Sequence, residues 1–329
     1  MKILLTGSSG FIGKNLEKAL QEKFPGEEIV SLKRKGKSSA SELSDNCSYI
    51  DYSDIDTLLD CKDCASVDLA FHLAGVTREV SFERFYQANV MPTKNLLDAL
   101  KQKSPNLERF IFTSSHAASG PSKNRQHKKT ESEEDNPVEY YGESKWMAEQ
   151  VVKDYHSILP CTILRPGSVY GPWDPDFLNI FKMAKSGINV YAGNKKKFTS
   201  IIYIDDLVDG MISASLSGST IAKNYFMCND EPVSWQQIHE TIFKAMGKEP
   251  FNISIPFPFI KALSYLGDAY ANLSGKCSLL NVQKVKLSEP YFWIASNENA
   301  KKDFGYSPQV SLDEGIRLTY DYYRANKQL

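Results

Sequence analysis

A tyrosine and a lysine four residues apart could move a proton. Tyr141 and Lys145 lie in a segment whose pattern predicts a helix, and this spacing places both side chains on one helical face. A free tyrosine has a pKa of about 10, and a neighbouring ammonium favours the phenolate. We therefore expect Tyr141 to act as acid and base near neutral pH, beside the strand-end serines Ser114 and Ser115.

Three glycines near the N-terminus could bind a diphosphate. The apolar run Ile3 to Leu5 leads into Gly7, Gly10 and Gly13, which predicts a strand, a glycine turn and a helix. Because glycine has no Cβ, a diphosphate can approach the backbone amides at the positive end of that helix. A tight strand-to-helix turn without a ligand is the alternative interpretation.

The residues after the second strand bear on the type of dinucleotide. Residues 29–32 predict this strand, and the basic run Lys33-Arg34-Lys35-Gly36-Lys37 follows where an NAD site would carry an acidic residue. Basic side chains there can bind the 2′-phosphate of NADP, which a carboxylate would repel. A solvated charged loop is the alternative. Asp51, with Tyr52 beside it, ends a third strand and could reach the adenine or cap a turn.

The first half of the chain continues to alternate strand and helix. Residues 67–75 predict a buried strand that ends in small residues, residues 85–100 predict a helix, and residues 108–115 predict the next strand. This alternation predicts a doubly wound parallel sheet, whose ligands lie beyond the carboxyl ends of the strands. We interpret His72 as a structural histidine rather than as an acid or base.

The composition is that of an ordinary globular protein. The chain has 329 residues, of which 42% are hydrophobic and 24% charged, and its formal net charge of -1 gives no reason to expect nucleic acid as a partner. The six cysteines lack the spacing of a disulfide framework or of paired metal ligands, so we expect no metal. The sequence shows neither a basic, apolar leader nor an apolar run long enough to span a membrane, so we expect a cytoplasmic protein.

The second half is less regular. Residues 173–187 predict a loop and a helix, residues 200–207 predict a strand and a helix start with Asp205 or Asp206 as N-cap, and residues 233–238 begin a further capped helix.

One later helix is unusually apolar. Residues 255–273 contain five large apolar side chains in helical register, namely Phe259, Leu263, Leu266, Tyr270 and Leu273. The helix either packs on the core or forms an apolar lid that covers a hydrophobic substrate and touches a membrane.

Taken in order, the motifs resemble those of the extended short-chain dehydrogenase/reductase family over almost the whole chain. The resemblance rests on Thr6-Gly7-x-x-Gly10-x-x-Gly13, His72-Leu73-Ala74-Gly75, Asn89, Ser114-Ser115, Tyr141-x-x-x-Lys145 and Arg165-Pro166-Gly167-Ser168-Val169-Tyr170-Gly171-Pro172. It implies an α/β fold, with a Rossmann-type doubly wound parallel sheet and a smaller, mostly helical C-terminal substrate domain. The NAD(P)-binding domain would comprise residues 1–171 and 201–229, and the substrate-binding domain residues 172–200 and 230–329. A homodimer that forms through the helix bearing Tyr141 and its neighbouring helix is also implied.

The resemblance implies a role for each motif. Ser115 would hydrogen-bond the reacting oxygen, Tyr141 would move its proton, and Lys145 would hold the nicotinamide ribose while lowering the tyrosine pKa. The candidate cofactor-binding residues are Gly7, Ser9, Gly10, Phe11, Ile12, Gly13, Lys33, Arg34, Asp51, Tyr52, Leu73, Ala74, Gly75, Asn89, Thr113, Tyr141, Lys145, Pro166, Gly167, Ser168 and Val169. The candidate substrate-binding residues are Thr77, Ser115, His116, Ala117, Tyr141 and Gly167.

The residues after Ser115 discriminate between the reactions of this family. His116-Ala117-Ala118 stands where sugar-nucleotide dehydratases carry an acidic pair, and Ser119 before Gly120 looks more like the 3β-hydroxysteroid dehydrogenase and dihydroflavonol reductase branch than like the epimerases. We therefore predict an NAD(P)-dependent oxidoreductase that interconverts a secondary alcohol and a ketone on a fairly apolar small molecule, with NADP slightly favoured over NAD. The alternatives are a nucleotide-sugar epimerase with tightly bound NAD and a non-catalytic NAD(P)-binding sensor or scaffold.

Overall fold

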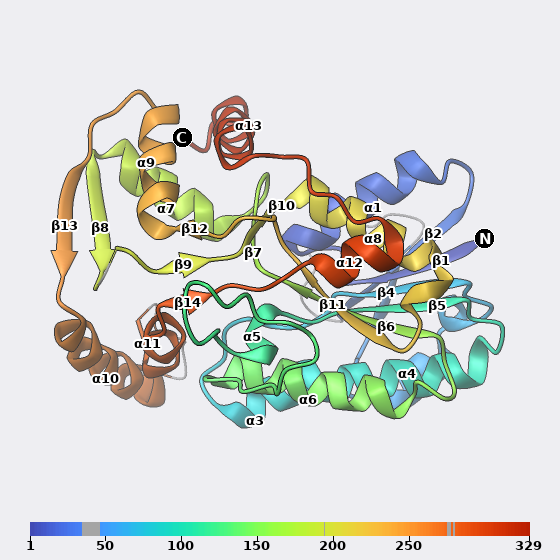
Figure 1. The fold of residues 1–329 in the computed structure, drawn as a ribbon. Helices are drawn as coiled ribbons and strands as arrows, with labels where there is room; N and C mark the ends of the chain where they lie inside the picture. Colours follow the sequence, from blue (N-terminus) through green and yellow to red (C-terminus); the bar gives the residue numbers. More distant parts are fainter. Residues whose placement is uncertain (35–46, 194, 275–277, 279) are drawn as a thin grey trace.

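A seven-stranded parallel sheet forms the centre of the computed structural model, which describes residues 1–34, 47–193, 195–274, 278 and 280–329 (Figure 1). The strand order is β11 (Lys223–Met227), β6 (Cys161–Pro166), β5 (Arg109–Thr113), β4 (Leu69–His72), β1 (Lys2–Thr6), β2 (Glu28–Arg34) and β3 (Cys47–Ile50). Because all neighbouring strands are parallel, their carboxyl ends meet at one edge. The strand order reverses between β1 and β4, which is where such sheets bind ligands. The predicted doubly wound sheet is confirmed.

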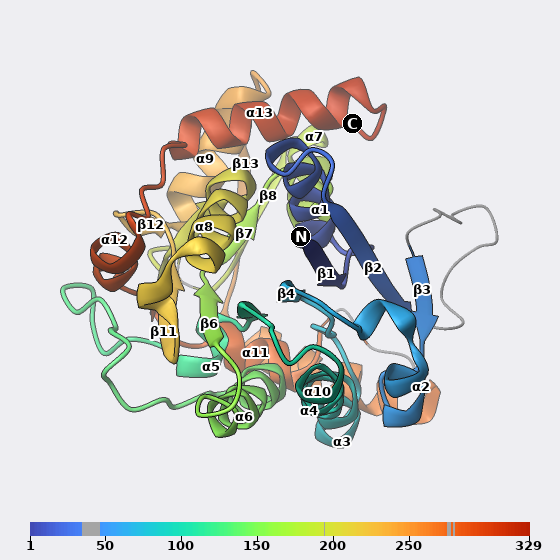
Figure 2. The same cartoon turned by 90° about the vertical axis from the view of Figure 1, so that its right-hand side faces the viewer.

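Helices cover both faces of this sheet (Figures 1 and 2). One face carries α1 (Phe11–Lys23), α8 (Ile204–Leu216) and α12 (Glu298–Phe304), and the other carries α2 (Ile55–Asp60), α3 (Phe82–Phe85), α4 (Met91–Lys103) and α6 (Tyr140–Asp154). Successive side chains of a strand point to opposite faces, so Ile3 and Leu5 join the first core while Leu4 joins the second. The predicted helix over residues 85–100 is interrupted by a π-helical turn, Tyr86–Val90, between α3 and α4.

The second half adds short strands and further helices beyond the carboxyl edge. The strands form three small sheets, β7 (Ser168–Tyr170) with β10 (Ile201–Tyr203), β8 (Ile188–Ala192) with β13 (Phe251–Ile255), and β9 (Phe198–Thr199) between β12 (Val233–Ser234) and β14 (Phe292–Trp293). The remaining helices are α5 (His116–Ser119), α7 (Pro175–Lys185), α9 (Trp235–Ala245), α10 (Phe257–Ser274), α11 (Val282–Ser288) and α13 (Leu312–Ala325), with 3₁₀ turns at Lys62–Cys64 and Gly218–Thr220.

Two of the predicted helix starts can be compared with the structure. Ser234 is the N-cap of α9 and forms a capping box with Gln237, as predicted. The N-cap prediction for α8 is wrong, because α8 begins after Tyr203 and the Asp206 carboxylate instead accepts the backbone N–H groups of Gln309 and Val310. Asp206 therefore fastens the segment before α13 to α8.

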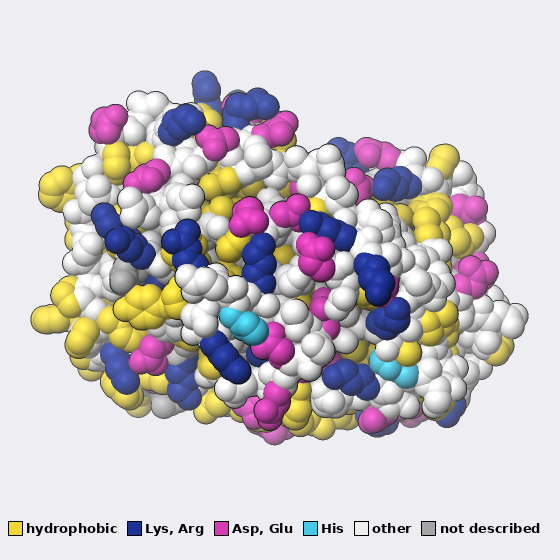
Figure 3. Space-filling view, viewed as in Figure 1, with side chains coloured by type: hydrophobic (Ala, Val, Ile, Leu, Met, Phe, Trp, Pro, Cys, Tyr) yellow, Lys and Arg dark blue, Asp and Glu magenta, His cyan; other side chains and the backbone are white. Residues whose placement is uncertain are grey.

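The apolar face of α10 points outward. All five side chains of the predicted register are exposed, from 48% for Leu263 to 90% for Leu273, while Ile260 and Ser264 face inward. The prediction that this face packs on the core is therefore wrong. Figure 3 shows hydrophobic side chains gathered at the end of the molecule that carries β13 and α10. Within the described ranges, no helix is long and apolar enough to cross a bilayer.

A buried ion-pair network joins α6 to the sheet. Arg165, at 1% exposure on β6, donates from Nε to the Glu149 carboxylate of α6 at 2.8 Å and from both terminal nitrogens to Asp135 at 2.8 and 2.7 Å. Glu149 is fully buried and also accepts a hydrogen bond from the hydroxyl of Ser114 at 2.5 Å. The two carboxylates raise the pKa of the Arg165 guanidinium against the effect of burial, so the group stays charged.

We expect Glu149→Gln to lower the free energy of unfolding by about 3 kcal/mol, because it removes one partner of a buried ion pair and leaves the Arg165 charge undercompensated. The measurement is urea denaturation followed by circular dichroism. As a matched control, Arg317→Gln removes one partner of the exposed pair with Asp321 and should change stability by less than about 0.5 kcal/mol. Equal effects of the two variants would contradict the stabilising role of the network.

Candidate active site

Helix α6 presents Tyr141, Lys145 and Glu149 at intervals of four residues, so they lie along one face. The helix starts at a defined point because the Glu139 carboxylate accepts the backbone N–H groups of Tyr141 and Gly142, each at 2.6 Å. A Cβ on Gly142 would lie 2.4 Å from the carbonyl oxygen of Ala117. The absence of a side chain there lets α6 contact the turn that follows β5.

The two strand-end serines point in different directions. Ser114 donates to the buried Glu149, as described above. Ser115 caps α5 by accepting the N–H of Ala117 at 3.1 Å, and its side chain lies next to the Tyr141 phenol in the lining of the same cavity. The structure thus brings Ser115, and not Ser114, together with Tyr141.

Burial governs the charge of this group of residues. It raises the pKa of Tyr141 to about 12, against a smaller lowering by the nearby Ser115 hydroxyl. It also lowers the pKa of Lys145 to about 8, partly offset by Glu149, and the Lys145 ammonium lies 4.4 Å above the Phe112 ring. The sequence predicted a lowered tyrosine pKa, so the direction is the opposite of that expectation. Tyr141 is a protonated phenol at neutral pH.

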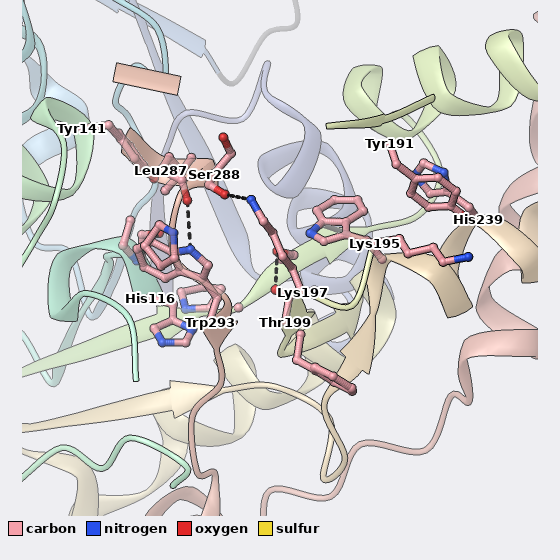
Figure 4. Close-up of a pocket in the computed structure, with 18 of the residues that line it drawn as sticks. His116, Tyr141, Tyr191, Lys195, Lys197, Thr199, His239, Leu287, Ser288 and Trp293 are labelled. Carbon is pink, nitrogen blue, oxygen red and sulfur yellow. Dashed lines mark hydrogen bonds between the residues drawn. The ribbon is translucent and has the colours of Figure 1, made fainter. Parts of the chain in front are cut away.

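A cavity of about 490 Å³ opens beside Ser115 and Tyr141 (Figure 4). Its walls come from both halves of the chain, and most of them are aromatic or aliphatic. The lining residues are Ser115, His116, Ala117, Tyr141, Pro166, Gly167, Ser168, Val190, Tyr191, Lys195, Lys197, Phe198, Thr199, Trp235, His239, Leu287, Ser288, Pro290 and Trp293. Of the predicted substrate-binding residues, Thr77 is exposed and is not among these lining residues, whereas the other five are.

His116 contributes an unpartnered nitrogen next to this cavity. Its ring packs edge-on against Phe226 and Trp293, and within the described residues its buried Nε2 has no hydrogen-bond partner. Burial, with the nearby charges of Lys129 and Arg165, lowers its pKa to about 3. His116 is therefore neutral and is available as a hydrogen-bonding group rather than as a cation.

The glycine turn leaves backbone groups available for a ligand. Gly7 has φ +76°, and a Cβ on Gly13 would lie 2.1 Å from the Gly7 carbonyl oxygen, so neither position accepts a side chain without a shift. Among the described residues, no side chain caps the start of α1 at Gly10, and the first turn holds no acidic residue. An uncapped helix start with free N–H groups attracts an anion.

Two buried hydroxyls without a hydrogen-bond partner among the described residues indicate a ligand at the same edge of the sheet. Ser8 in the glycine turn and Thr113 at the end of β5 each bury a hydroxyl oxygen that has no partner among the described residues. A buried hydroxyl without a hydrogen bond is costly, so a polar ligand would satisfy both. Together with the uncapped α1, these atoms fit a dinucleotide at the carboxyl edge.

Hydrogen bonds from β1 and α4 hold the end of β4 and the residues that follow it. The imidazole of His72 contacts Thr6 Oγ1 at 2.7 Å through Nδ1 and Thr93 Oγ1 at 3.0 Å through Nε2. His72 is thus a satisfied structural histidine, as predicted. Ala74 donates its N–H to Thr6 Oγ1 at 3.1 Å, so the loop Leu73-Ala74-Gly75 is held next to the glycine turn.

The amide side chain of Asn89 forms its hydrogen bonds within the protein, so Asn89 holds neighbouring segments together. Its Oδ1 accepts the N–H of Val76 at 2.7 Å, and its Nδ2 donates to the Val76 carbonyl and to the Ser144 hydroxyl. Asn89 lies in the π-helical turn, a feature that often occurs at functional sites. The predicted cofactor residue thus links the loop after β4 to α6.

The residues predicted to bind the adenosine end of the cofactor lie near the carboxyl ends of β2 and β3. Lys33 and Arg34 end β2 and are half-buried, while positions 35–37 of the basic run lie outside the described residues. Asp51 accepts the N–H and hydroxyl of Ser53, which is the turn-capping alternative. The Tyr52 hydroxyl donates to the Leu32 carbonyl at 2.7 Å, so Tyr52 is tied to β2.

The turn after β6 forms the floor of the cavity. Pro166, Gly167 and Ser168 line it, and Val169 packs towards the core. A Cβ on Gly167 would lie 2.4 Å from the Ser200 carbonyl oxygen, so this turn lies directly against the segment that follows β9.

Sequence reasoning missed the cavity residues that lie just before β9 and in α9 and α11, such as Lys197, Trp235 and Leu287. Only the three-lysine run at positions 195–197, followed by Phe198 and Thr199, could have drawn attention to this part of the wall.

Comparison with known proteins agrees with this geometry. Residues 3–225 match the family model of the NAD dependent epimerase/dehydratase family. A 2-alkyl-3-oxoalkanoate reductase of Stenotrophomonas maltophilia is 26% identical, over 96% of this chain and 98% of its own, and an N-acetyl-alpha-D-glucosaminyl-diphospho-ditrans,octacis-undecaprenol 4-epimerase of Escherichia coli O157:H7 is 24% identical over 99% and 96%.

Solved structures show the same fold over the whole chain. A UDP-glucose 4-epimerase of Thermotoga maritima superposes with a TM-score of 0.80 at 22% identity, over 99% of this chain and 100% of that one. A UDP-glucuronic acid 4-epimerase of Bacillus cereus, in complex with UDP-glucuronic acid and NAD, gives 0.77 at 25% identity over the same shares. The chain belongs to the NAD dependent epimerase/dehydratase family and is an oxidoreductase of that family that uses a nicotinamide cofactor.

Proposed function

We propose that this enzyme interconverts a secondary alcohol and a ketone on an apolar substrate, with an exchangeable nicotinamide cofactor. This proposal rests on the cavity beside Tyr141 and Ser115, whose walls consist largely of aromatic and aliphatic side chains. Such walls favour an alkyl or ring system over a sugar diphosphate. The similarity to a 2-alkyl-3-oxoalkanoate reductase over almost the full length of both chains supports the same reaction class.

The residues around the cavity have separable tasks. The bound cofactor supplies or accepts the hydride. Ser115 hydrogen-bonds the substrate oxygen, and Tyr141 donates its proton to that oxygen in the reducing direction and takes it back in the oxidising direction. Because burial raises the pKa of Tyr141 to about 12, its phenol proton is present at neutral pH, as reduction of a ketone requires.

We propose NADP as the preferred dinucleotide. The uncapped start of α1 and the glycine turn would hold the diphosphate, and Lys145 the nicotinamide ribose. Lys33 and Arg34 stand at the end of β2 with no carboxylate at that position, which supports binding of a 2′-phosphate.

A nucleotide-sugar epimerase with tightly bound NAD is the second candidate, because several structural neighbours are epimerases. A non-catalytic sensor is the third, and the adjacency of Ser115, Tyr141 and Lys145 argues against it. Identification of the nucleotide released on denaturation separates the first two. Stoichiometric NAD would favour the epimerase, whereas an empty site that prefers NADPH and reduces apolar ketones would support the proposal.

We also propose a division of the chain into two domains, a cellular location and an oligomeric state. The cavity lies between residues 1–171 and the segments 172–200 and 230–329, which supports assignment of the latter to a substrate-binding domain. The described cysteines Cys61, Cys64, Cys161 and Cys228 are free thiols, which supports a cytoplasmic location. A homodimer through α6 rests on the family resemblance, and sedimentation of the purified protein tests it.

We expect Tyr141→Phe to lower kcat by about 10²–10⁴-fold, because it removes the transferable proton, while the cofactor Kd changes by less than about threefold. Stopped-flow turnover and cofactor titration measure the two quantities. Tyr140→Phe deletes the same atom one residue away, outside the cavity lining, and should behave like the wild type. Full turnover by Tyr141→Phe would exclude it as the acid and base.

The two serines should separate kinetically. Ser115→Ala is expected to lower kcat by about 10²–10³-fold through loss of an oxyanion donor. Ser114→Ala should instead lower the free energy of unfolding by about 1–3 kcal/mol, because Glu149 loses a hydrogen bond in a buried site. A larger kinetic effect at Ser114 would reverse the assignment.

Replacement of both Lys33 and Arg34 by Ala should reduce the preference for NADPH over NADH by about tenfold or more, since charge-assisted hydrogen bonds to the 2′-phosphate are lost. The ratio of the two cofactor Kd values is the readout. Lys18→Ala, an exposed lysine on α1, serves as the control. An unchanged ratio would identify the basic run as a solvated loop.

A further inference from the structure

Lys197 places a buried positive charge in the wall of the substrate cavity. The residue is 8% exposed and lines the same cavity as Ser115 and Tyr141. Burial of an ammonium is unfavourable unless hydrogen bonds and charges compensate it. Across the ranges that the structure describes, no carboxylate lies within 4.0 Å of this ammonium to form an ion pair with it.

The compensation that the protein provides is partial, and the only carboxylate that contributes to it among the described residues, Glu289, acts from more than 4.0 Å away. The Lys197 ammonium donates one hydrogen bond, to the backbone carbonyl of Ser288 at the end of α11 (Figure 4). It also lies 4.8 Å from the centre of the Phe257 ring and 5.9 Å from that of Tyr291. An ammonium has three N–H donors, and these contacts use one of them as a hydrogen bond to an oxygen.

The backbone holds Lys197 in place for a ligand. Its carbonyl accepts the N–H of Trp235 at 3.0 Å, and the N–H of the next residue, Phe198, donates to the carbonyl of Tyr291 at 2.8 Å. These bonds fix the backbone of Lys197 between β12 and β14, while burial and the hydrogen bond to Ser288 hold its side chain. Little side-chain ordering therefore remains to be done when a ligand binds. Lys195, the other lysine of the lining, is exposed and points away from Ser288 (Figure 4).

We propose that the substrate carries an anionic oxygen group, a carboxylate or a phosphate ester, and that Lys197 binds it inside the cavity while the apolar body contacts the aromatic walls. This inference rests on the proposed function for the reaction itself. It specifies the substrate as an amphiphilic alcohol or ketone, since a neutral sterol or alkyl ketone would leave the two remaining N–H donors of Lys197 unused. The buried neutral imidazoles His116 and His239 add hydrogen-bonding capacity but no competing charge.

The alternative is that Lys197 only caps the carboxyl end of α11. A structural cap would affect all ligands equally, whereas an anion-binding residue would act only on charged ones. The test therefore compares ligands of one chain length that differ in their head group.

Binding is measured by quenching of tryptophan fluorescence, because Trp235 and Trp293 line the cavity. The probes are dodecanoate, dodecyl phosphate and methyl dodecanoate, added to the wild type, Lys197→Met, Lys197→Arg and the exposed neighbour Lys196→Met. We expect the wild type to bind one of the anions at least about tenfold more tightly than the ester. Lys197→Met should abolish this ratio, Lys197→Arg should retain part of it, and Lys196→Met should keep it.

Equal binding of anions and ester by the wild type would overturn the proposal, as would an equal loss for all three probes in Lys197→Met. Which anion binds more tightly distinguishes a carboxylate from a phosphate. A parallel assay compares reduction of 3-oxododecanoate with that of its methyl ester. Turnover without preference for the acid would leave the proposed function intact and reject the role of Lys197. If neither ketone is reduced, the result counts against the proposed function. The binding ratios would then still decide the role of Lys197.

Discussion

The geometry of this site depends on one buried carboxylate. Glu149 lies two helical turns from Tyr141, accepts a hydrogen bond from Ser114, and pairs with Arg165 on β6. By turning Ser114 towards the interior, it leaves Ser115 to face the cavity. By binding Arg165, it fixes the strand whose next residues, Pro166 to Ser168, form the cavity floor. The ion pair thus sets the relative position of α6, β5 and β6 at the point where their functional residues meet.

The cofactor side of the site is built by a different constraint, the close approach of backbone to backbone. At Gly7, Gly13, Gly142 and Gly167 an added Cβ would lie within 3 Å of a main-chain atom of another segment. A side chain at Gly142 would push α6 away from the turn after β5, and one at Gly167 would push the turn after β6 away from the segment that follows β9. Electrostatic pairing and close backbone contact therefore act together at the same edge of the sheet.

Local patterns predicted the parts of the site that are local in sequence. The glycine turn, the spacing of Tyr141 and Lys145, the strand alternation and the structural role of His72 all follow from short segments, and the structure contains them. The pKa of Tyr141 could not be predicted, because it depends on burial by residues from other elements. The same holds for Asp135, which lies in a polar loop with no evident role in sequence and yet supplies a carboxylate to Arg165.

The walls of the substrate cavity were the part of the site that the sequence predicted least well. Lys197, Trp235 and Trp293 come together only through the small sheet in which β9 pairs with β12 and β14, and this pairing joins segments up to about one hundred residues apart. Nor could the outward orientation of α10 be predicted, since an amphipathic register does not specify which face meets the core.

The ion-pair network around Glu149 and the residues that line much of the substrate cavity are separate sets, and this has an evolutionary consequence. None of the residues on β9, α9, α11 or β14 that line the cavity takes part in the hydrogen bonds that hold Glu149 and Arg165. Substitutions in those walls can change which molecule is accepted while the proton-transfer residues keep their positions. Substrate selectivity in this chain can therefore change through single substitutions that leave the proton-transfer residues in position.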